Sequence, residues 1–217
     1  GPVVRQAHQP EQVKEGLISL LLHAPKTFWT VGLVQFFCWA AFMYMWTYSN
    51  GTIAANCWNA TSAASEGYQA AGNWVGVVFA IQAIGSILWA IVIPKFKSLK
   101  LAYVVSLLLG AIGFISVAFV HNQYVLFLSY FLIGAAWAAM LALPFTLLTN
   151  SLSGEHMGSY LGLFNCTICL PQIIAAALGG VILKLCGGVQ ANMMIIAGVL
   201  LILGAVSVRF VTEKHSK

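Results

Sequence analysis

The chain has 217 residues, of which 60% are hydrophobic and only 7% are charged, and its mean hydropathy is +0.89. Soluble domains carry about 25% charged residues, so this composition excludes an ordinary soluble protein and indicates a polytopic membrane protein. The formal net charge is +5. Because the cations are scattered among short loops, they do not form the basic patch that binds nucleic acid.

The segment before the first apolar stretch, residues 1–26, is expected to be a linker. Within it, residues 11–23 (EQVKEGLISLLLH) place leucines on one helical face and charged side chains on the other. This pattern predicts an amphipathic helix that is too short to span a bilayer. It lies either at the membrane interface or as an arm packed under the bundle. The chain begins with Gly1-Pro2 and not with Met, which favours a fragment or a trimmed chain.

Six stretches without a charged residue are long enough to cross a membrane. A transmembrane helix needs about 20 apolar residues for a hydrocarbon core of roughly 30 Å. Lipid cannot satisfy backbone polar groups, and these stretches are too long and too uniformly apolar for barrel strands, so we predict an all-α fold. The predicted spans are 27–48, 73–93, 101–120, 124–148, 160–183 and 192–208.

The Lys and Arg residues lie mostly on one side of these spans. Nine of the ten fall before the first span, between the second and third spans, or in the tail, and only Lys184 falls on the other side. Positive charge is retained in cytoplasmic loops, so both termini are expected in the cytoplasm. The bundle is expected over residues 27–211 in a plasma or inner membrane, followed by a tail, 212–217. The longest connection, 49–72, is predicted to be a polar loop on the outer side.

The sequence offers no arrangement for catalysis or for binding a metal or cofactor. It contains no Asp, and all five Glu residues lie outside the spans. Cys166 and Cys169 form a CxxC in mid-span, but no charged neighbour would activate a thiol there, so we interpret them as small apolar filling. Glu155 with His156 is the one ionisable pair open to a membrane-embedded enzyme, and we interpret it as a solvated turn. The chain is therefore not expected to be an enzyme.

Uncharged polar and aromatic side chains inside the spans are the candidate solute contacts. In the first span, Gln35, Trp39, Phe42 and Trp46 follow helical spacing and form one stripe. Amides can bridge the vicinal hydroxyls of a sugar, and an indole can cover the apolar face of its ring. This combination favours a neutral, hydroxyl-rich solute.

Four further residues in other spans belong to this candidate set. Asn165 and Gln172 are seven residues apart in the fifth span and share a face, about 10 Å apart along the axis. Gln82 and Trp137 stand near the middle of the second and fourth spans. Buried amides in lipid also serve as interhelical hydrogen-bonding groups, so a structural role stays open for each.

The topology and one motif resemble a known family. Six spans with both ends inside and a basic loop after the second resemble the C-terminal half, helices 7 to 12, of a major facilitator superfamily transporter. The runs ALPFTLLTN and MGSYLGLFNCTICLPQI resemble the glycoside, pentoside and hexuronide cation symporters, particularly their sucrose-transporter-like branch. The matching positions are Pro144, Phe145, Gly158, Gly162, Asn165, Pro171 and Gln172.

The resemblance implies secondary transport of a sugar or glycoside by alternating access, coupled to a cation that is usually a proton. The first, second, fourth and fifth spans would then face a central cavity, and the third and sixth would face lipid. Pro144, Pro171, Gly158 and Gly162 would be hinge or gating positions, with static kinks as the alternative reading of the prolines. Because no span holds an acid, the coupling carboxylate is expected in an N-terminal six-helix half.

One position departs from the family pattern. Pro94 stands in the basic loop where many facilitators carry an acid that latches the cytoplasmic gate. Lys95, Lys97 and Lys100 are therefore expected to meet lipid headgroups or acids of the other half. Two alternatives stay open: a six-helix facilitator or channel that works as an oligomer, and a major facilitator for a non-sugar solute.

Overall fold

The computed structural model describes residues 9–213, and the side chains from residue 16 onward. This part of the chain is helical without strands, and six of its helical stretches are long and apolar enough to cross a membrane. The elements are α1 (Gln9–Leu22), α2 (Lys26–Trp58), α3 (Glu66–Val92), η1 (Ile93–Lys95), α4 (Leu99–Phe119), α5 (Leu126–Ser151), α6 (Met157–Phe164), α7 (Cys166–Leu185), α8 (Gln190–Ser207) and η2 (Val208–Phe210).

The first span is longer than predicted, and the prediction of a loop over 49–72 was wrong. Helix α2 continues to Trp58, and α3 begins at Glu66, so the connection covers only residues 59–65. Polar residues that suggested a loop find partners in the helical bundle: the buried Thr52 donates to the Tyr48 carbonyl of its own helix over 2.8 Å, and Ser49 accepts from Tyr130 of α5. Ser65 then caps α3, its Oγ accepting from the Tyr68 N–H.

The fifth predicted span consists of two helices that meet at Asn165. Around this residue the backbone bonds tighten, because the Asn165 N–H bonds the Gly162 carbonyl and the Ile168 N–H bonds the Asn165 carbonyl. Such tighter turns within a helical stretch occur at hinges and at strained positions. The fifth span is thus jointed at Asn165, nearly two turns before Pro171 and near its N-terminal end.

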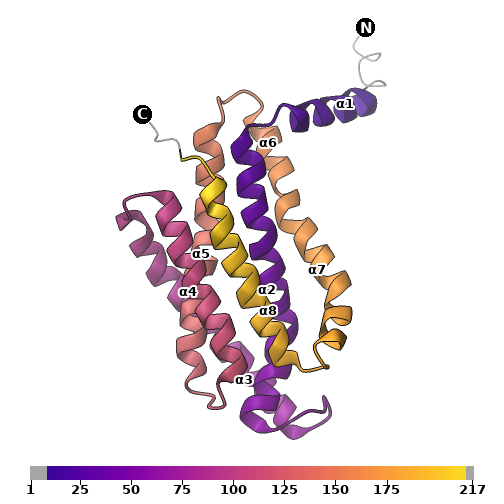
Figure 1. The fold of residues 1–217 in the computed structure, drawn as a ribbon, viewed down its shortest axis with the longest axis vertical. Coiled ribbons are helices and arrows are strands. Elements are labelled where there is room, and N and C mark those ends of the chain that lie inside the picture. The colour runs from indigo at the N-terminus through magenta and orange to yellow at the C-terminus, as the bar shows by residue number, and fades with distance from the viewer. Residues whose placement is uncertain (1–8, 214–217) are drawn as a thin grey trace.

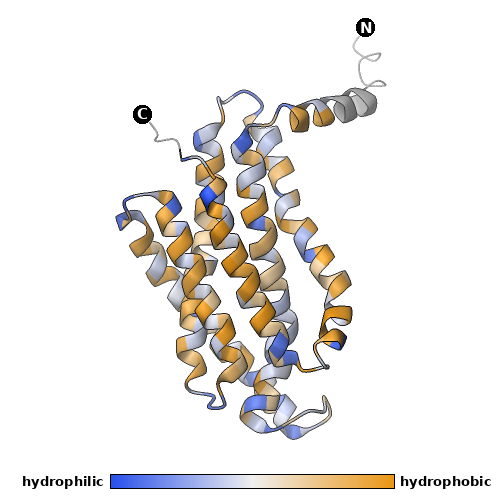
Figure 2. Ribbon diagram, viewed as in Figure 1, coloured by the Kyte–Doolittle hydropathy of each residue, from blue (hydrophilic) through white to orange (hydrophobic). Residues whose placement is uncertain are grey.

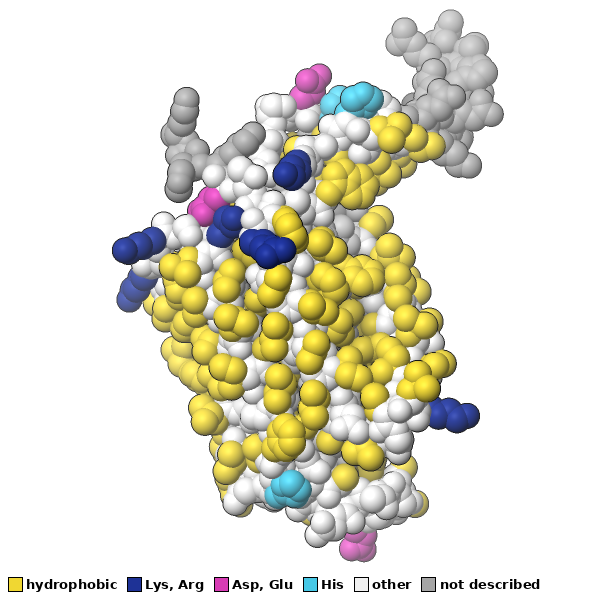
Figure 3. Space-filling model, viewed as in Figure 1, with side chains coloured by type: hydrophobic (Ala, Val, Ile, Leu, Met, Phe, Trp, Pro, Cys, Tyr) yellow, Lys and Arg dark blue, Asp and Glu magenta, His cyan; other side chains and the backbone are white. Residues whose placement is uncertain are grey.

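Helices α2 and α5 form the centre of the bundle (Figure 1). Helix α2 packs against α8, α7 and α3, helix α5 packs against α3 and α4, and α4 packs against α8. Both ends of the described chain lie at one end of the bundle. We call this the basic end, because the Lys and Arg side chains gather there while Lys184 lies near the other end (Figure 3).

Small residues let α3 and α5 approach closely. A Cβ on Gly134 of α5 would collide with the backbone carbonyl of Gln82, and one on Gly85 of α3 would lie 2.5 Å from the Phe131 carbonyl. Helices in lipid associate through such close packing, since burial of apolar surface drives them little. The crossing therefore fixes α3 against α5.

The surface of the bundle is apolar along the helices and polar at both ends (Figure 2). Helix α1 covers nearly all of the segment 11–23 that was predicted to be helical. It leaves the bundle at the basic end (Figure 1). Tyr160 Oη donates to the Leu20 carbonyl over 3.0 Å and ties the end of α1 to α6. Leu20 and Leu21 are half-buried, while Ile18 and Leu22 are exposed.

Candidate functional site

Three tryptophans from α2 and α5 form an aromatic cluster. The ring centroid of Trp137 on α5 lies 5.5 Å from that of Trp39 and 5.9 Å from that of Trp46, both on α2. Phe42, between them on the same stripe, lies 5.3 Å from Trp137. These separations are typical of favourable aromatic pairs. The stripe predicted on the first span therefore forms a continuous surface that faces α5.

Gln35 lies one turn from this cluster, towards the basic end, and is fully buried. Its Oε1 accepts the indole N–H of Trp39 over 3.0 Å. Its Nε2 has no hydrogen-bond partner in the described part of the chain. A buried donor without a partner costs about 1–3 kcal/mol. The amide is thus oriented by one indole and retains an unused donor.

Pro144 of α5 lies at the depth of this buried glutamine. Helices α2 and α5 run in opposite directions, and Tyr130 of α5 donates to Ser49 of α2 over 2.7 Å. Seven residues later on α5 and seven residues earlier on α2, Trp137 contacts Phe42. A second step of seven residues in the same two directions leads to Pro144 on α5 and Gln35 on α2. Because both helices rise 1.5 Å per residue, the two positions are level.

Gln172 of α7 lies at nearly the same depth. Helices α2 and α7 both begin at the basic end and run in the same direction (Figure 1). Gly32 of α2 faces Thr167, and twelve residues further along both helices Tyr44 faces Gly179. By this register Gln172 is level with residue 37 of α2. Its Nε2 donates to the Ile168 carbonyl of its own helix over 3.0 Å, and the side chain is half-buried.

The two predicted hinge prolines stand inside helices at this same level. Pro144 interrupts α5, and Pro171 interrupts α7. A proline has no N–H, so the carbonyls four residues earlier, on Met140 and Thr167, lack their usual intrahelical partner. One depth of the bundle thus combines two amide side chains with two carbonyls released from helical pairing.

The other predicted site residues lie elsewhere. Asn165 is exposed at the joint between α6 and α7, nearer the basic end. Gly158 and Gly162 lie on α6, where a Cβ would meet nothing within 4 Å. Gln82 is buried at the α3 and α5 crossing, about 15 Å along the bundle from Gln35 and level with Trp46. The structure therefore joins Gln35, Trp39 and Trp137, and aligns Gln172 with them.

An apolar groove of about 420 Å³ runs between α2 and α6–α7. Its wall on α2 includes Trp29, Leu33 and Phe36, which follow helical spacing and were not among the predicted site residues. Sequence inspection could have found them by that spacing, although exposed aromatics are also normal against lipid. The full lining is Leu21, Phe28, Trp29, Gly32, Leu33, Phe36, Leu163, Cys166, Thr167, Leu170 and Pro171.

Trp46 is a second omission from the predicted site set. It was placed on the stripe, but only Trp39 and Trp137 were singled out for contact with a solute. In the structure it joins both of them, and its side chain is 40% exposed while that of Trp39 is 6% exposed. Trp46 is therefore the member of the cluster that reaches the surface.

A comparison with protein families decides the class of the chain. The model of the Major Facilitator Superfamily matches residues 28–217, which cover all six spans except the first two residues of α2. The chain belongs to this superfamily. Its members are membrane transporters of small molecules, so the site described above lies in a facilitator bundle. Comparison with curated proteins and with solved structures returns no match.

Proposed function

We propose that this facilitator chain is one half of a secondary transporter for sugars or glycosides, with the solute bound at the level of Gln35 and Gln172. The observation that carries the proposal is the unpaired Nε2 of Gln35 beside the tryptophan cluster. A sugar hydroxyl would accept from that donor, and an indole would cover the ring face. No charge is needed for this recognition, which agrees with spans whose charged residues lie only near their ends.

The second wall of the site would come from another six-helix half. Facilitators bind their substrates between two such halves near the midplane of the bilayer. The apolar side chains exposed on α3 and α7 offer surface for that half or for lipid, among them Ile84, Ile87, Ile91, Leu170, Ile173 and Leu178. Under this proposal the basic end faces the cytoplasm, because positive loops are retained there.

Coupling to a proton would use an acid of the other half. Proton carriers inside membranes are normally carboxylates. Within the described residues, Glu66 begins α3, Glu155 lies in the turn before α6, and Glu213 follows η2, so these three lie at the ends of the spans. This half would therefore provide solute contacts and a moving wall, while the proton is carried elsewhere.

The test is uptake into proteoliposomes that contain the full-length transporter. A panel of labelled disaccharides would be offered with and without an inward proton gradient. We expect accumulation of at least one glycoside, stimulated by the gradient, and a loss of about tenfold in Gln35→Ala. Gln69→Ala, an exposed glutamine in the first turn of α3, is the matched control. Transport of peptides or amino acids without any glycoside would refute the proposal.

A non-sugar solute is the second candidate, and the apolar groove between α2 and α6–α7 favours it. The groove carries exposed aromatic and aliphatic side chains, and it reaches Pro171 at the level of the amides. An amphipathic solute would place its apolar part there. Leu33→Ala separates the two candidates, since it should weaken uptake of an amphipathic solute and leave sugar uptake unchanged.

A further inference from the structure

Helices α4 and α8 lie side by side and present a broad apolar face to the outside of the bundle. Exposed side chains on this face come from both helices and include Leu101, Leu108, Val199, Ile202, Leu203 and Val206. Figure 3 shows many yellow apolar side chains along this face and no dark blue or magenta ones among them, with dark blue basic side chains above it at the basic end. The boundary between the two is where phospholipid headgroups meet their acyl chains in a bilayer.

A groove of about 540 Å³ crosses this boundary between the two helices. Its mouth is formed by Lys100, in the first turn of α4, and by Arg209, just after α8. Its walls are aliphatic from both helices. The full lining is Lys100, Leu101, Val104, Ala205, Val206, Val208 and Arg209. The groove therefore has a cationic mouth and an apolar floor that continues into the membrane-facing surface.

The one described acid near this mouth is already occupied by backbone amides. Glu213 accepts from the Leu99 N–H over 2.8 Å and from the Lys100 N–H over 3.5 Å, so its carboxylate caps α4. Lys100 Nζ donates to the Arg209 carbonyl over 3.4 Å, which holds the lysine side chain against the end of α8. The guanidinium of Arg209 lies 4.7 Å from the centre of the Phe210 ring.

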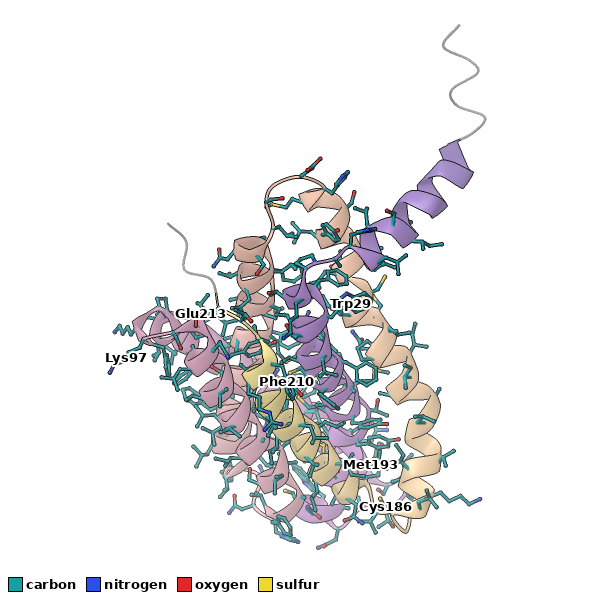
Figure 4. All side chains as sticks on the ribbon, turned by 45° about the horizontal axis from the view of Figure 1, so that its top comes forward. Trp29, Lys97, Cys186, Met193, Phe210 and Glu213 are labelled. Carbon is teal, nitrogen blue, oxygen red and sulfur yellow. The ribbon has the colours of Figure 1, made fainter. Side chains whose placement is uncertain are left out.

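Other basic residues surround the mouth without lining it. Lys95 and Lys97 belong to the connection before α4, and both are exposed. Figure 4 shows Lys97 directed away from the bundle, while Phe210 and Glu213 lie along the segment that follows α8. The local charge of the described residues at this corner is positive, since Lys95, Lys97, Lys100 and Arg209 outnumber Glu213.

We propose that the groove between α4 and α8 binds an anionic phospholipid of the surrounding membrane. The phosphate would lie between Lys100 Nζ and the Arg209 guanidinium, and one acyl chain would lie along Leu101, Val104 and Val206. A bidentate guanidinium and an ammonium with three donors suit a phosphate. Basic residues at the surface attract anionic lipids. The apolar floor selects a lipid over a soluble phosphate, because only an acyl chain would bury it.

This assignment is independent of the transported solute. The groove lies on α4 and α8, whereas the candidate solute contacts lie on α2, α5 and α7. A bound lipid would link the start of α4 to the end of α8, the same pair that Glu213 already links. It would thus support the outer wall of the bundle while the inner helices rearrange.

The test is lipid retention measured by native mass spectrometry of the full-length protein. The protein would be released from a phosphatidylcholine bilayer doped with phosphatidylglycerol. The double variant Lys100→Gln with Arg209→Gln should retain about tenfold less phosphatidylglycerol than the wild type. The matched control, Lys95→Gln with Lys97→Gln, removes the same charge outside the groove and should retain nearly all of it. Equal losses in the two variants would show diffuse attraction and overturn the proposal.

A second pair of variants tests the acyl chain without changing charge. Val206→Trp fills the groove from an exposed position, and Leu203→Trp adds the same bulk to the neighbouring exposed face of α8. Retention should fall in the first variant and stay at the wild-type level in the second. Full retention in Val206→Trp would contradict a lipid seated in this groove, even if the charge variants behave as expected.

Discussion

The two walls that carry the candidate solute contacts differ in how firmly they are held. The wall formed by α2 and α5 is buried, and side-chain bonds join its parts, from Trp39 to Gln35 and from Tyr130 to Ser49. The wall formed by α6 and α7 exposes most of its side chains, is jointed at Asn165, and carries a glutamine that bonds its own helix.

This difference suggests a division of labour between the walls. Side chains held by partners on a packed wall keep one geometry, as recognition of a ring and its hydroxyls requires. A helix with few buried contacts can move at low cost. We therefore expect α2 and α5 to determine which solute is bound, and α6–α7 to move and close the site over it.

The largest effect is expected at the α3 and α5 crossing that supports the packed wall. Gly134→Ala places a Cβ against the backbone of α3, which cannot yield without separating the helices. We expect a loss of about 3 kcal/mol or more in stability and poor expression, measured by thermal unfolding in detergent.

Gly162→Ala on α6 is the matched variant on the other wall. Its Cβ would meet nothing within 4 Å, so the better helix propensity of alanine should leave the protein as stable or up to about 1 kcal/mol more stable. Equal destabilisation by both substitutions would contradict the contrast between the walls.

The next effect is expected at Gln35. Gln35→Ala leaves the Trp39 indole N–H without its acceptor, which should lower stability by about 1 kcal/mol. The rate of uptake should fall by about tenfold, which is more than this loss of stability explains, because the free Nε2 donor is lost as well. A variant with normal uptake and reduced stability would show that Gln35 is purely structural. Unfolding curves and uptake rates from the same preparation separate the two outcomes.

A smaller effect, on rate alone, is expected at Pro171. Pro171→Ala supplies an N–H for the Thr167 carbonyl and stiffens α7, so uptake should slow severalfold while thermal stability is kept or raised. Pro94→Ala, at an exposed proline of η1, is the control. An unchanged rate in Pro171→Ala would show that the kink is static.

The smallest effect on stability is expected at Gln172. Its donor bonds a carbonyl of its own helix, so Gln172→Ala should change the free energy of unfolding by less than about 0.5 kcal/mol. Uptake should nevertheless weaken, since the amide is level with Gln35. Loss of expression would instead assign Gln172 to helix packing.

The number of spans and their helical structure could be predicted from sequence, because backbone polar groups inside lipid must bond one another and a helix does this within one segment. Six uncharged stretches had to be helices. Their ends could not be predicted as well, since Ser49 and Thr52 look like loop residues but are buried in α2, where Thr52 bonds its own helix and Ser49 accepts from Tyr130 of α5. The joint at Asn165 was also missed, because the pattern of apolar residues stays the same where the backbone hydrogen bonds shorten from four to three residues apart.

The candidate site could be predicted only within single helices. The stripe from Gln35 to Trp46 follows from helical spacing, and in the structure the rings along it contact one another. That Pro144 and Gln172 share its depth depends on the register between helices, which the sequence of one helix does not contain. The cap that Glu213 places on α4 was likewise out of reach, since the two segments are 114 residues apart.

Equilibrium binding of a labelled disaccharide tests the central statement most directly. The full-length transporter would be compared with Gln35→Ala, Gln172→Ala and the double variant, with Gln69→Ala as control. If one solute contacts both amides, each single variant should weaken binding about tenfold, and the double variant should lose less than the two single losses combined. Wild-type affinity in both single variants would contradict a solute site at this level of the bundle.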